Sequence, residues 1–178
     1  MNYRLTVIVI ILFVLSLQIK VMAQEHEAAP YSPHKLAVMI AHTHVPGAGT
    51  GTQSSGLIVP SWGLDYEYWI DPHWAIGLHN DMEIATYVVE GHEGKEIERE
   101  RPVIVSLVGL FKPTHQLILL AGFGRELEKH DSYWVTRFGV EYEFEINHSW
   151  ELSPSLIYDI KESVYDSWSI GLAVGKRM

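Results

Sequence analysis

The sequence predicts an all-β fold, namely an eight-stranded antiparallel up-and-down transmembrane β-barrel that follows a cleaved signal peptide. Three observations predict it: an apolar N-terminal segment with a cleavage pattern, eight later segments with a two-residue hydrophobic period, and connections that alternate between long and short. A two-residue period places apolar side chains on one face of a strand and polar side chains on the other. An even number of strands closes the sheet, so that no backbone group stays unpaired in lipid.

The composition limits the classes of function that remain. Of the 178 residues, 47% are hydrophobic, 20% are charged and 11% are aromatic, which is typical of one folded domain. The chain carries 22 acidic and 13 basic residues, a net charge of −9, which disfavours nucleic-acid binding because phosphates attract basic surfaces. The sequence has no cysteine, which excludes disulfides, thiol catalysis and thiolate zinc sites.

The N-terminal segment has the features of a secretory signal peptide. Arg4 forms a short positive region, Thr6 to Leu17 is almost purely apolar, and Val21-Met22-Ala23 supplies a small-residue cleavage pattern. The apolar run is shorter than the roughly 20 residues that a membrane-spanning helix needs, so we expect export and cleavage. The predicted organisation is a signal peptide over 1–23, a flexible periplasmic leader over 24–34 and a barrel over 35–178.

Eight segments of the mature chain have the period of β-strands and are rich in Val, Ile, Leu, Tyr, Trp and Phe. Each is long enough to cross a bilayer, which takes about 9 to 11 residues of a tilted strand. The alternation is clearest near the C-terminus, where Trp168, Ile170 and Leu172 share one face and Ser167, Ser169 and Gly171 the other. The predicted strands are 35–45, 56–70, 73–89, 102–112, 115–127, 132–146, 148–161 and 165–177.

Each predicted strand has an apolar and a polar face, and the period alone does not decide which face lines the interior. In an outer-membrane barrel the apolar face meets lipid, whereas in a secreted lipocalin-like barrel that binds a small apolar ligand it forms the core. Aromatic residues near strand ends favour the membrane, because outer-membrane barrels carry aromatic girdles at both interfaces. These residues are Trp62, Tyr66, Tyr68, Trp74, Trp134, Tyr142, Phe144, Trp150, Tyr158 and Trp168.

The connections between the predicted strands alternate in length. Residues 46–55 and 90–101 form long spacers, whereas 71–72 and 113–114 allow only tight turns. Short periplasmic turns and longer extracellular loops are typical of bacterial outer-membrane barrels. We therefore expect both termini in the periplasm and the two long loops outside the cell, where they form a possible surface for an extracellular partner.

The signal peptide, the eight amphipathic strands and the terminal run 165–178 resemble the small eight-stranded OmpX/OmpA-like outer-membrane β-barrels of Gram-negative bacteria. The resemblance is one of pattern and covers residues 35–178. It implies a monomer in the outer membrane that contacts outer-membrane lipid, is inserted by the barrel assembly machinery and needs no cofactor. Members of such families usually end in an aromatic residue, whereas this chain has Met178 at that outward position.

Charged residues at the odd positions of 56–70 and 73–89, together with later charges, are predicted to point into the barrel. An eight-stranded barrel is only wide enough for side chains to fill it, so we expect a plugged lumen and not a wide pore. Arg137 is the expected hub, because one guanidinium can hold two carboxylates. The network is either structural or a cation or proton site. Its predicted members are Asp65, Glu67, His79, Asp81, Glu83, Arg137, Glu141, Glu143 and Asp159.

Two other patterns carry possible chemistry. His42 and His44 lie two residues apart on one strand face, which makes them weak candidates for a metal site. Ser61, His79 and Asp81 offer a hydroxyl, a base and an acid, the groups that a lipid A deacylase or acyltransferase barrel would use. The sequence contains no nucleophile motif such as G-x-S-x-G, so we expect a non-enzymatic protein with a structural or surface-interaction role.

Overall fold

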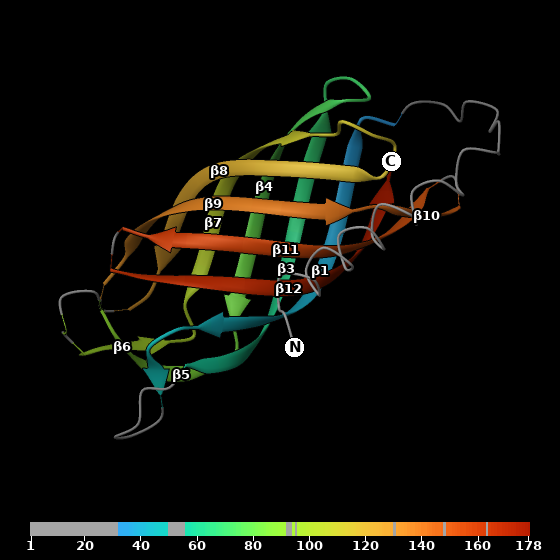
Figure 1. The fold of residues 1–178 in the computed structure, drawn as a ribbon. Coiled ribbons are helices and arrows are strands. Elements are labelled where there is room, and N and C mark those ends of the chain that lie inside the picture. Colours follow the sequence, from blue (N-terminus) through green and yellow to red (C-terminus); the bar gives the residue numbers. More distant parts are fainter. Residues whose placement is uncertain are drawn as a thin grey trace, which may run out of the picture. The chain divides into compact units, whose positions relative to one another are not determined.

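The computed structural model describes residues 32–49, 56–91, 94, 96–129, 131–147, 149–162 and 164–178 (Figure 1). Every regular element in this part of the chain is a β-strand. The described residues include no helix that is long and apolar enough to cross a membrane. The predicted signal peptide, most of the predicted leader and loop residues 50–55 lie outside the described residues.

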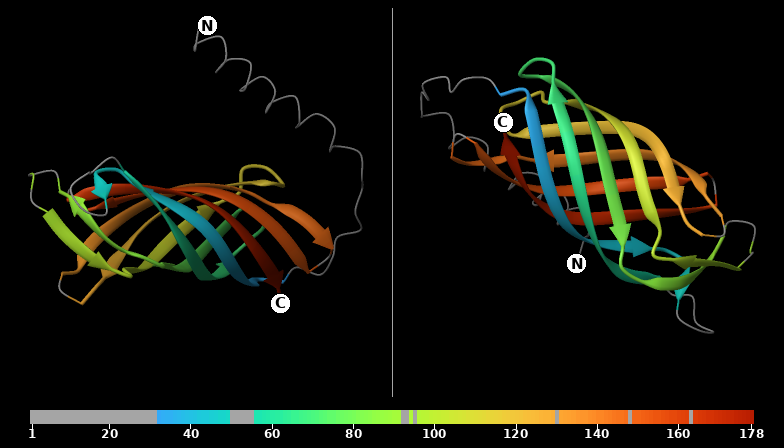
Figure 2. Two further views of the ribbon diagram at one scale, coloured as in Figure 1. Left: turned by 90° about the horizontal axis from the view of Figure 1, so that it is seen from below. Right: turned by 180° about the vertical axis from the view of Figure 1, so that it is seen from behind.

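Eight antiparallel strands close into one barrel, as predicted (Figures 1 and 2). Each strand pairs with the next barrel strand along the chain, and β12 pairs with β1 from Arg177 opposite Lys35 to Trp168 opposite His44. The strands are β1 (His34–Val45), β3 (Leu57–Trp69), β4 (Trp74–Glu83), β7 (Val103–Phe111), β8 (Leu117–Leu127), β9 (Tyr133–Tyr142) with its continuation β10 (Phe144–Asn147), β11 (Trp150–Lys161) and β12 (Tyr165–Arg177).

A second, three-stranded sheet formed by β2 (Ala48–Gly49), β5 (Thr86–Glu90) and β6 (Glu96–Glu100) lies at one end of the barrel (Figure 1). We call this the sheet end, and we call the other end, where the backbone N–H of Met178 donates to the carbonyl of His34, the terminal end. The prediction of a single strand over 73–89 and a loop over 90–101 is wrong here. The two-residue period continues through Thr86–Val89, but this segment leaves the barrel and pairs with β6 and β2.

The apolar faces of the barrel strands point outward. Along β1, for example, Val38 and Ile40 are exposed whereas Ala37 and Met39 are buried, and along β3 Trp62 is exposed beside buried Ser61. This arrangement is the reverse of what the lipocalin-like alternative requires, because there the apolar face would form the core. Apart from the break after Glu83, the observed strand bounds agree with the predicted ones to within two residues.

The barrel interior combines an apolar wall with charged strands. A buried apolar cluster centres on the inward side chains of β7 and β8 and comprises Trp69, Ala75, Val108, Leu110, Ile118, Leu120 and Ile157. Further along β8, Gly122 and Gly124 lie so close to β7 that an added Cβ would overlap the carbonyl oxygens of Leu107 and Val105. The inward side chains of β3, β4, β9 and β11 are largely charged or hydroxylated.

Candidate functional site

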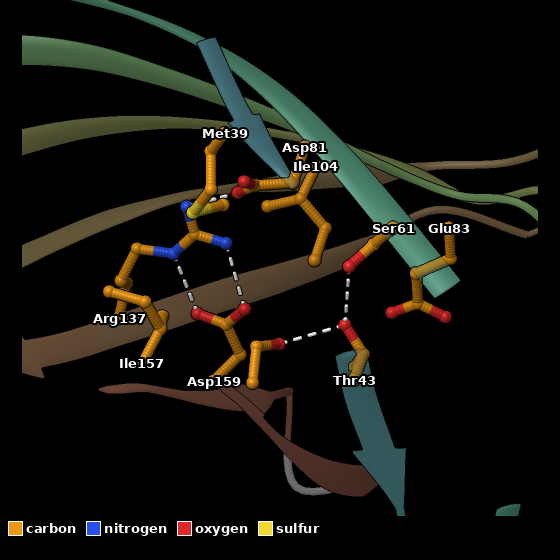
Figure 3. Close-up of a pocket in the computed structure, with 10 residues that line it drawn as sticks. Met39, Thr43, Ser61, Asp81, Glu83, Ile104, Arg137, Ile157 and Asp159 are labelled. Atoms are coloured by element: carbon orange, nitrogen blue, oxygen red, sulfur yellow. Dashed lines mark hydrogen bonds and ion pairs between the residues drawn. The ribbon is translucent and has the colours of Figure 1, made fainter. Parts of the chain in front are cut away.

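Arg137 occupies the middle of the barrel interior and connects three strands (Figure 3). Its Nε and Nη2 each donate to an oxygen of Asp159, directly opposite on β11, at 2.8 Å. Its Nη1 forms an ion pair with Asp81 on β4. All three side chains are buried, and the guanidinium fork thus holds two carboxylates, the geometry that the sequence analysis expected of Arg137.

A small cavity lies beside this triad (Figure 3). Its hydroxyl side is a short hydrogen-bonded row in which Thr43 Oγ1 lies 2.9 Å from Ser61 Oγ and 2.8 Å from Ser169 Oγ. The cavity has space for about a single water molecule. At this depth, therefore, side chains fill the barrel.

His79 and Asp65 lie opposite each other on β4 and β3, one step closer to the terminal end. His79 Nδ1 is 4.0 Å from Asp65 and its Nε2 is 3.9 Å from Glu67, distances too long for hydrogen bonds. Nε2 is buried and has no hydrogen-bond partner in the structure. Asp65 instead accepts from the backbone N–H of Asn80 at 3.2 Å.

Lysine, arginine and glutamate side chains gather at the terminal end of the interior. Lys35 Nζ lies 3.3 Å from Glu67, 3.4 Å from Glu151 and 3.8 Å from Glu143. Arg177 pairs with the same two glutamates, Glu143 and Glu151.

A buried tryptophan stands among these charges. The indole N–H of Trp69 donates to Glu67 at 2.8 Å, and the ring lies 5.5 Å from Lys112 Nζ and 4.9 Å from the guanidinium carbon of Arg177. Lys112 also pairs with Glu143. The interior at this end is therefore occupied by a ring and paired charges.

A third charged cluster lies at the sheet end. Lys161 Nζ is 2.9 Å from Glu126 and 3.2 Å from Glu83, and the hydroxyl of Tyr165 donates to Glu126 at 2.8 Å. Arg99, on β6, reaches from the small sheet to pair with Glu126. The small sheet is thus bound to the barrel by a buried ion pair.

Two side chains on the small sheet, Arg99 and Tyr87, have pKa values above their usual ones. Burial tends to lower the pKa of Arg99, but the nearby Glu126 carboxylate outweighs it and the pKa lies above its usual value. Burial raises the pKa of Tyr87 well above its usual value, and the adjacent Glu83, which accepts the Tyr87 hydroxyl, raises it further. Tyr87 therefore stays neutral and donates its proton to that hydrogen bond.

The structure places all nine predicted network residues inside the barrel, between its terminal end and its sheet end. The observed network also includes residues that were not predicted from the sequence. They sit near strand ends or outside the barrel strands and are Lys35, Arg99, Lys112, Glu126, Glu151, Lys161 and Arg177. For Lys35 a signal existed, because it shares the inward phase of Ala37 and Met39. For Arg99 none existed, because the charged segment 90–101 predicts a loop and not a strand.

The metal and enzyme candidates are not assembled into sites. His42 is exposed on the outer face, and the His44 ring packs at a tilt against Trp168, with the ring centroids 5.1 Å apart. The described residues contain no group of three or more His, Asp or Glu side chains placed to hold a metal ion. Ser61 bonds Thr43 and Asp81 pairs with Arg137, so these groups form no nucleophile–base–acid chain with His79.

Solved structures share this architecture. The Ail protein of Yersinia pestis, solved in complex with the heparin analogue sucrose octasulfate, matches with a TM-score of 0.54 and 12% identity over 82% of this chain and 97% of that chain. Neisserial surface protein A has a TM-score of 0.54 and 10% identity over 83% of this chain and 98% of that chain. The N-terminal β-barrel domain of Pseudomonas aeruginosa OprF has a TM-score of 0.54 and 10% identity over 83% of this chain and 100% of that chain.

The chain has the fold of the small eight-stranded outer-membrane β-barrels. No protein-family model and no curated protein matches the sequence. At these identities the similarity carries the outer-membrane barrel fold and no residue roles.

Proposed function

We propose that this chain is a monomeric, non-enzymatic outer-membrane β-barrel protein with a structural or surface-interaction role. The observation that carries the proposal is the inverted distribution of polarity around a closed barrel. Large apolar side chains such as Ile40, Phe123 and Ile170 are 66%, 62% and 57% exposed, while charged groups are buried inside. In water this belt would be costly, whereas in lipid it is stabilised by burial among acyl chains.

Aromatic side chains at both ends of the belt support the same proposal. Tyr66, Tyr68 and Trp74 are exposed toward the terminal end, and Trp134 and Trp168 toward the sheet end. Such side chains favour the two membrane interfaces. With the terminal end in the periplasm, the tight turns are periplasmic and the small sheet projects outside the cell.

We propose further that the lumen is closed by its charged network and does not conduct solutes. Three observations support it: the Trp69 ring among paired charges at the terminal end, the Arg137 triad at mid-barrel, and the Lys161 cluster at the sheet end. Oppositely charged side chains that satisfy each other hold the plug in place.

The experiment is gel migration in SDS of membrane-extracted protein, boiled against unboiled, combined with sugar-driven swelling of vesicles that contain the protein. We expect a faster-migrating unboiled form, because a closed membrane barrel resists SDS until it is heated, and no swelling. Recovery in the soluble periplasmic fraction with no shift would contradict membrane insertion. Swelling at the rate of an open pore would contradict the plug alone.

The small sheet is the proposed surface for an extracellular partner. Its exposed side chains include Glu90, Glu96, Glu98 and Glu100, so it repels a polyanion such as the polysulfate seen with Ail and favours a cationic partner. In nanodiscs, a lysine-rich peptide should bind the wild type and lose affinity for E96Q/E98Q/E100Q, whereas heparin should bind neither. Equal peptide binding to both proteins would contradict this assignment.

A further inference from the structure

The outward face of the barrel is apolar with few exceptions. Among the described barrel strands, only Arg125 and Lys176 present a lysine or arginine side chain to the outside. Arg125 lies near the sheet end of β8 and Lys176 near the terminal end of β12. Each stands over a tryptophan ring of a neighbouring strand, Arg125 over Trp134 of β9 at 5.4 Å and Lys176 over Trp150 of β11 at 5.5 Å.

Arg125 is surrounded by apolar side chains within the belt. On its own strand face it lies between Phe123 and Leu127, which are 62% and 44% exposed. On the neighbouring strands it stands opposite Val105 and Trp134. Arg125 thus lies two residues before the end of β8, and its guanidinium stands over Trp134 at the sheet-end edge of the apolar belt.

Arg125 differs from the inward-facing arginines in having no acidic partner among the described residues. Arg99, Arg137 and Arg177 each form an ion pair with a carboxylate. No described carboxylate forms an ion pair with Arg125. Glu162 approaches Trp134, the ring partner of Arg125, but its carboxylate accepts a hydrogen bond from the backbone N–H of Trp134 at 3.2 Å. The five guanidinium N–H groups of Arg125 thus have no carboxylate acceptor among the described residues.

An unpaired charge at the edge of an apolar belt is costly unless an anion meets it, and a bilayer supplies phosphate groups at its interface. A guanidinium matches a phosphate well, because its planar fork donates two parallel hydrogen bonds. A tryptophan ring that stacks on the guanidinium restricts its orientation and leaves the N–H edge free to donate.

We propose that Arg125 and Trp134 form a binding site for the phosphate group of a lipid headgroup. The inference rests on the proposed function, because the site needs the outward face to lie in lipid. Arg125 donates to the phosphate oxygens, Trp134 holds the guanidinium plane, and Phe123 and Leu127 contact the acyl chains. Lys176 and Trp150 repeat the arrangement at the terminal end. The compact ammonium of Lys176 cannot donate the two parallel hydrogen bonds that a guanidinium donates to a phosphate.

The test uses the full-length protein folded in a neutral maltoside detergent and measures retained lipid by native mass spectrometry. The probes are phosphatidic acid and diacylglycerol with identical acyl chains, which differ only in the phosphate. We expect wild-type protein to retain phosphatidic acid and not diacylglycerol. Arg125→Gln should weaken retention of phosphatidic acid at least tenfold, and Arg125→Lys should weaken it less.

Lys129→Gln is the matched control, because Lys129 is exposed in the turn after β8 and its loss changes the net charge equally. It should leave retention within twofold of wild type. Unchanged retention by Arg125→Gln, or an equal loss in Lys129→Gln, would overturn the site. Displacement of the lipid by glycerol 3-phosphate at a similar concentration would show a site for free phosphate and overturn the lipid assignment.

The same samples separate this inference from the proposed function. Every variant is first run boiled and unboiled in SDS, so that only folded barrels are compared. A wild type that shows the shift but no preference for phosphatidic acid contradicts the site alone. A wild type that shows no shift contradicts membrane insertion and with it the site.

Discussion

The interior wall made by β7 and β8 is apolar and close-packed, whereas the interior faces of β3, β4, β9 and β11 carry paired charges. On the first wall, Leu110 and Ile118 are fully buried, and Gly122 and Gly124 let the two strands approach. On the second, Arg137 is held by Asp81 and Asp159. Both walls fill the same barrel. The stability of the apolar wall depends on how well its side chains fill the space, whereas the stability of the charged strands depends on each charge having an oppositely charged partner.

The difference predicts unequal responses to substitution. A shortened apolar side chain leaves a cavity whose cost depends on how far neighbours relax. A lost charge leaves its partner buried and unpaired, which costs more than the pair itself contributes. Four measurements test this contrast, in order of decreasing effect.

The largest effect is expected for Arg137→Met. The substitution keeps much of the volume but leaves Asp81 and Asp159 without their cation, so the free energy of unfolding should fall by about 3–5 kcal/mol. Urea unfolding in vesicles, followed by tryptophan fluorescence, measures it. A triple variant with Asp81→Asn and Asp159→Asn added should recover part of the loss. An unchanged midpoint in Arg137→Met would remove Arg137 as the hub.

A smaller effect is expected on the apolar wall. Ile118→Ala should lower the free energy of unfolding by about 2–4 kcal/mol, because Ile118 is fully buried in the apolar cluster. The control is Leu119→Ala, one residue along, whose side chain points outward and is 40% exposed. Lipid chains can fill the space that it leaves, so its loss should be less than half as large. Equal losses would show that the two faces of β8 are packed alike.

The contact between the small sheet and the barrel should be weaker still. Tyr87→Phe removes the hydroxyl that donates to Glu83, while Glu83 keeps its ion pair with Lys161. Because the carboxylate is not left alone, we expect a loss of only about 1–2 kcal/mol in the same urea experiment. A loss as large as that of Arg137→Met would mean that the small sheet and the triad unfold as one network.

The smallest effect is a dependence on alkaline pH. Burial and Glu83 raise the pKa of Tyr87, so the folded chain keeps this proton when the unfolded chain has lost it. The stabilisation is complete below about pH 10, the pKa of a free tyrosine, and declines as the pH rises through the folded value. Tyr87→Phe should therefore flatten the fall in stability between about pH 10 and pH 11. Parallel curves for the two proteins would contradict the shift.

Much of the candidate site could be predicted from strand phase alone. Asp65, Glu67, Asp81 and Glu83 alternate with apolar residues, and the structure places all four inside. Their partners could not be predicted, because they come from distant strands. Lys35 meets Glu151, and Lys161 meets Glu83, through barrel closure that no local pattern encodes.

Two regions show where strand phase fails. Along β7 the chain reads Val103-Ile104-Val105, apolar on both faces, so the period does not say which side chains point inward. After Glu83 the period continues through Tyr87 and Val89, yet the segment joins another sheet and its neighbour β6 sends Arg99 into the barrel mouth.

The sequence by itself determined the eight barrel strands and which residues share a face of each, because side-chain alternation is a local property of an extended backbone. It also determined that charges and large apolar groups would be separated. Only the tertiary structure decided which charges meet, and that the chain after Glu83 leaves the barrel for a second sheet. Those outcomes depend on how a twisted sheet closes and on the register of β12 against β1, which brings together residues more than a hundred positions apart.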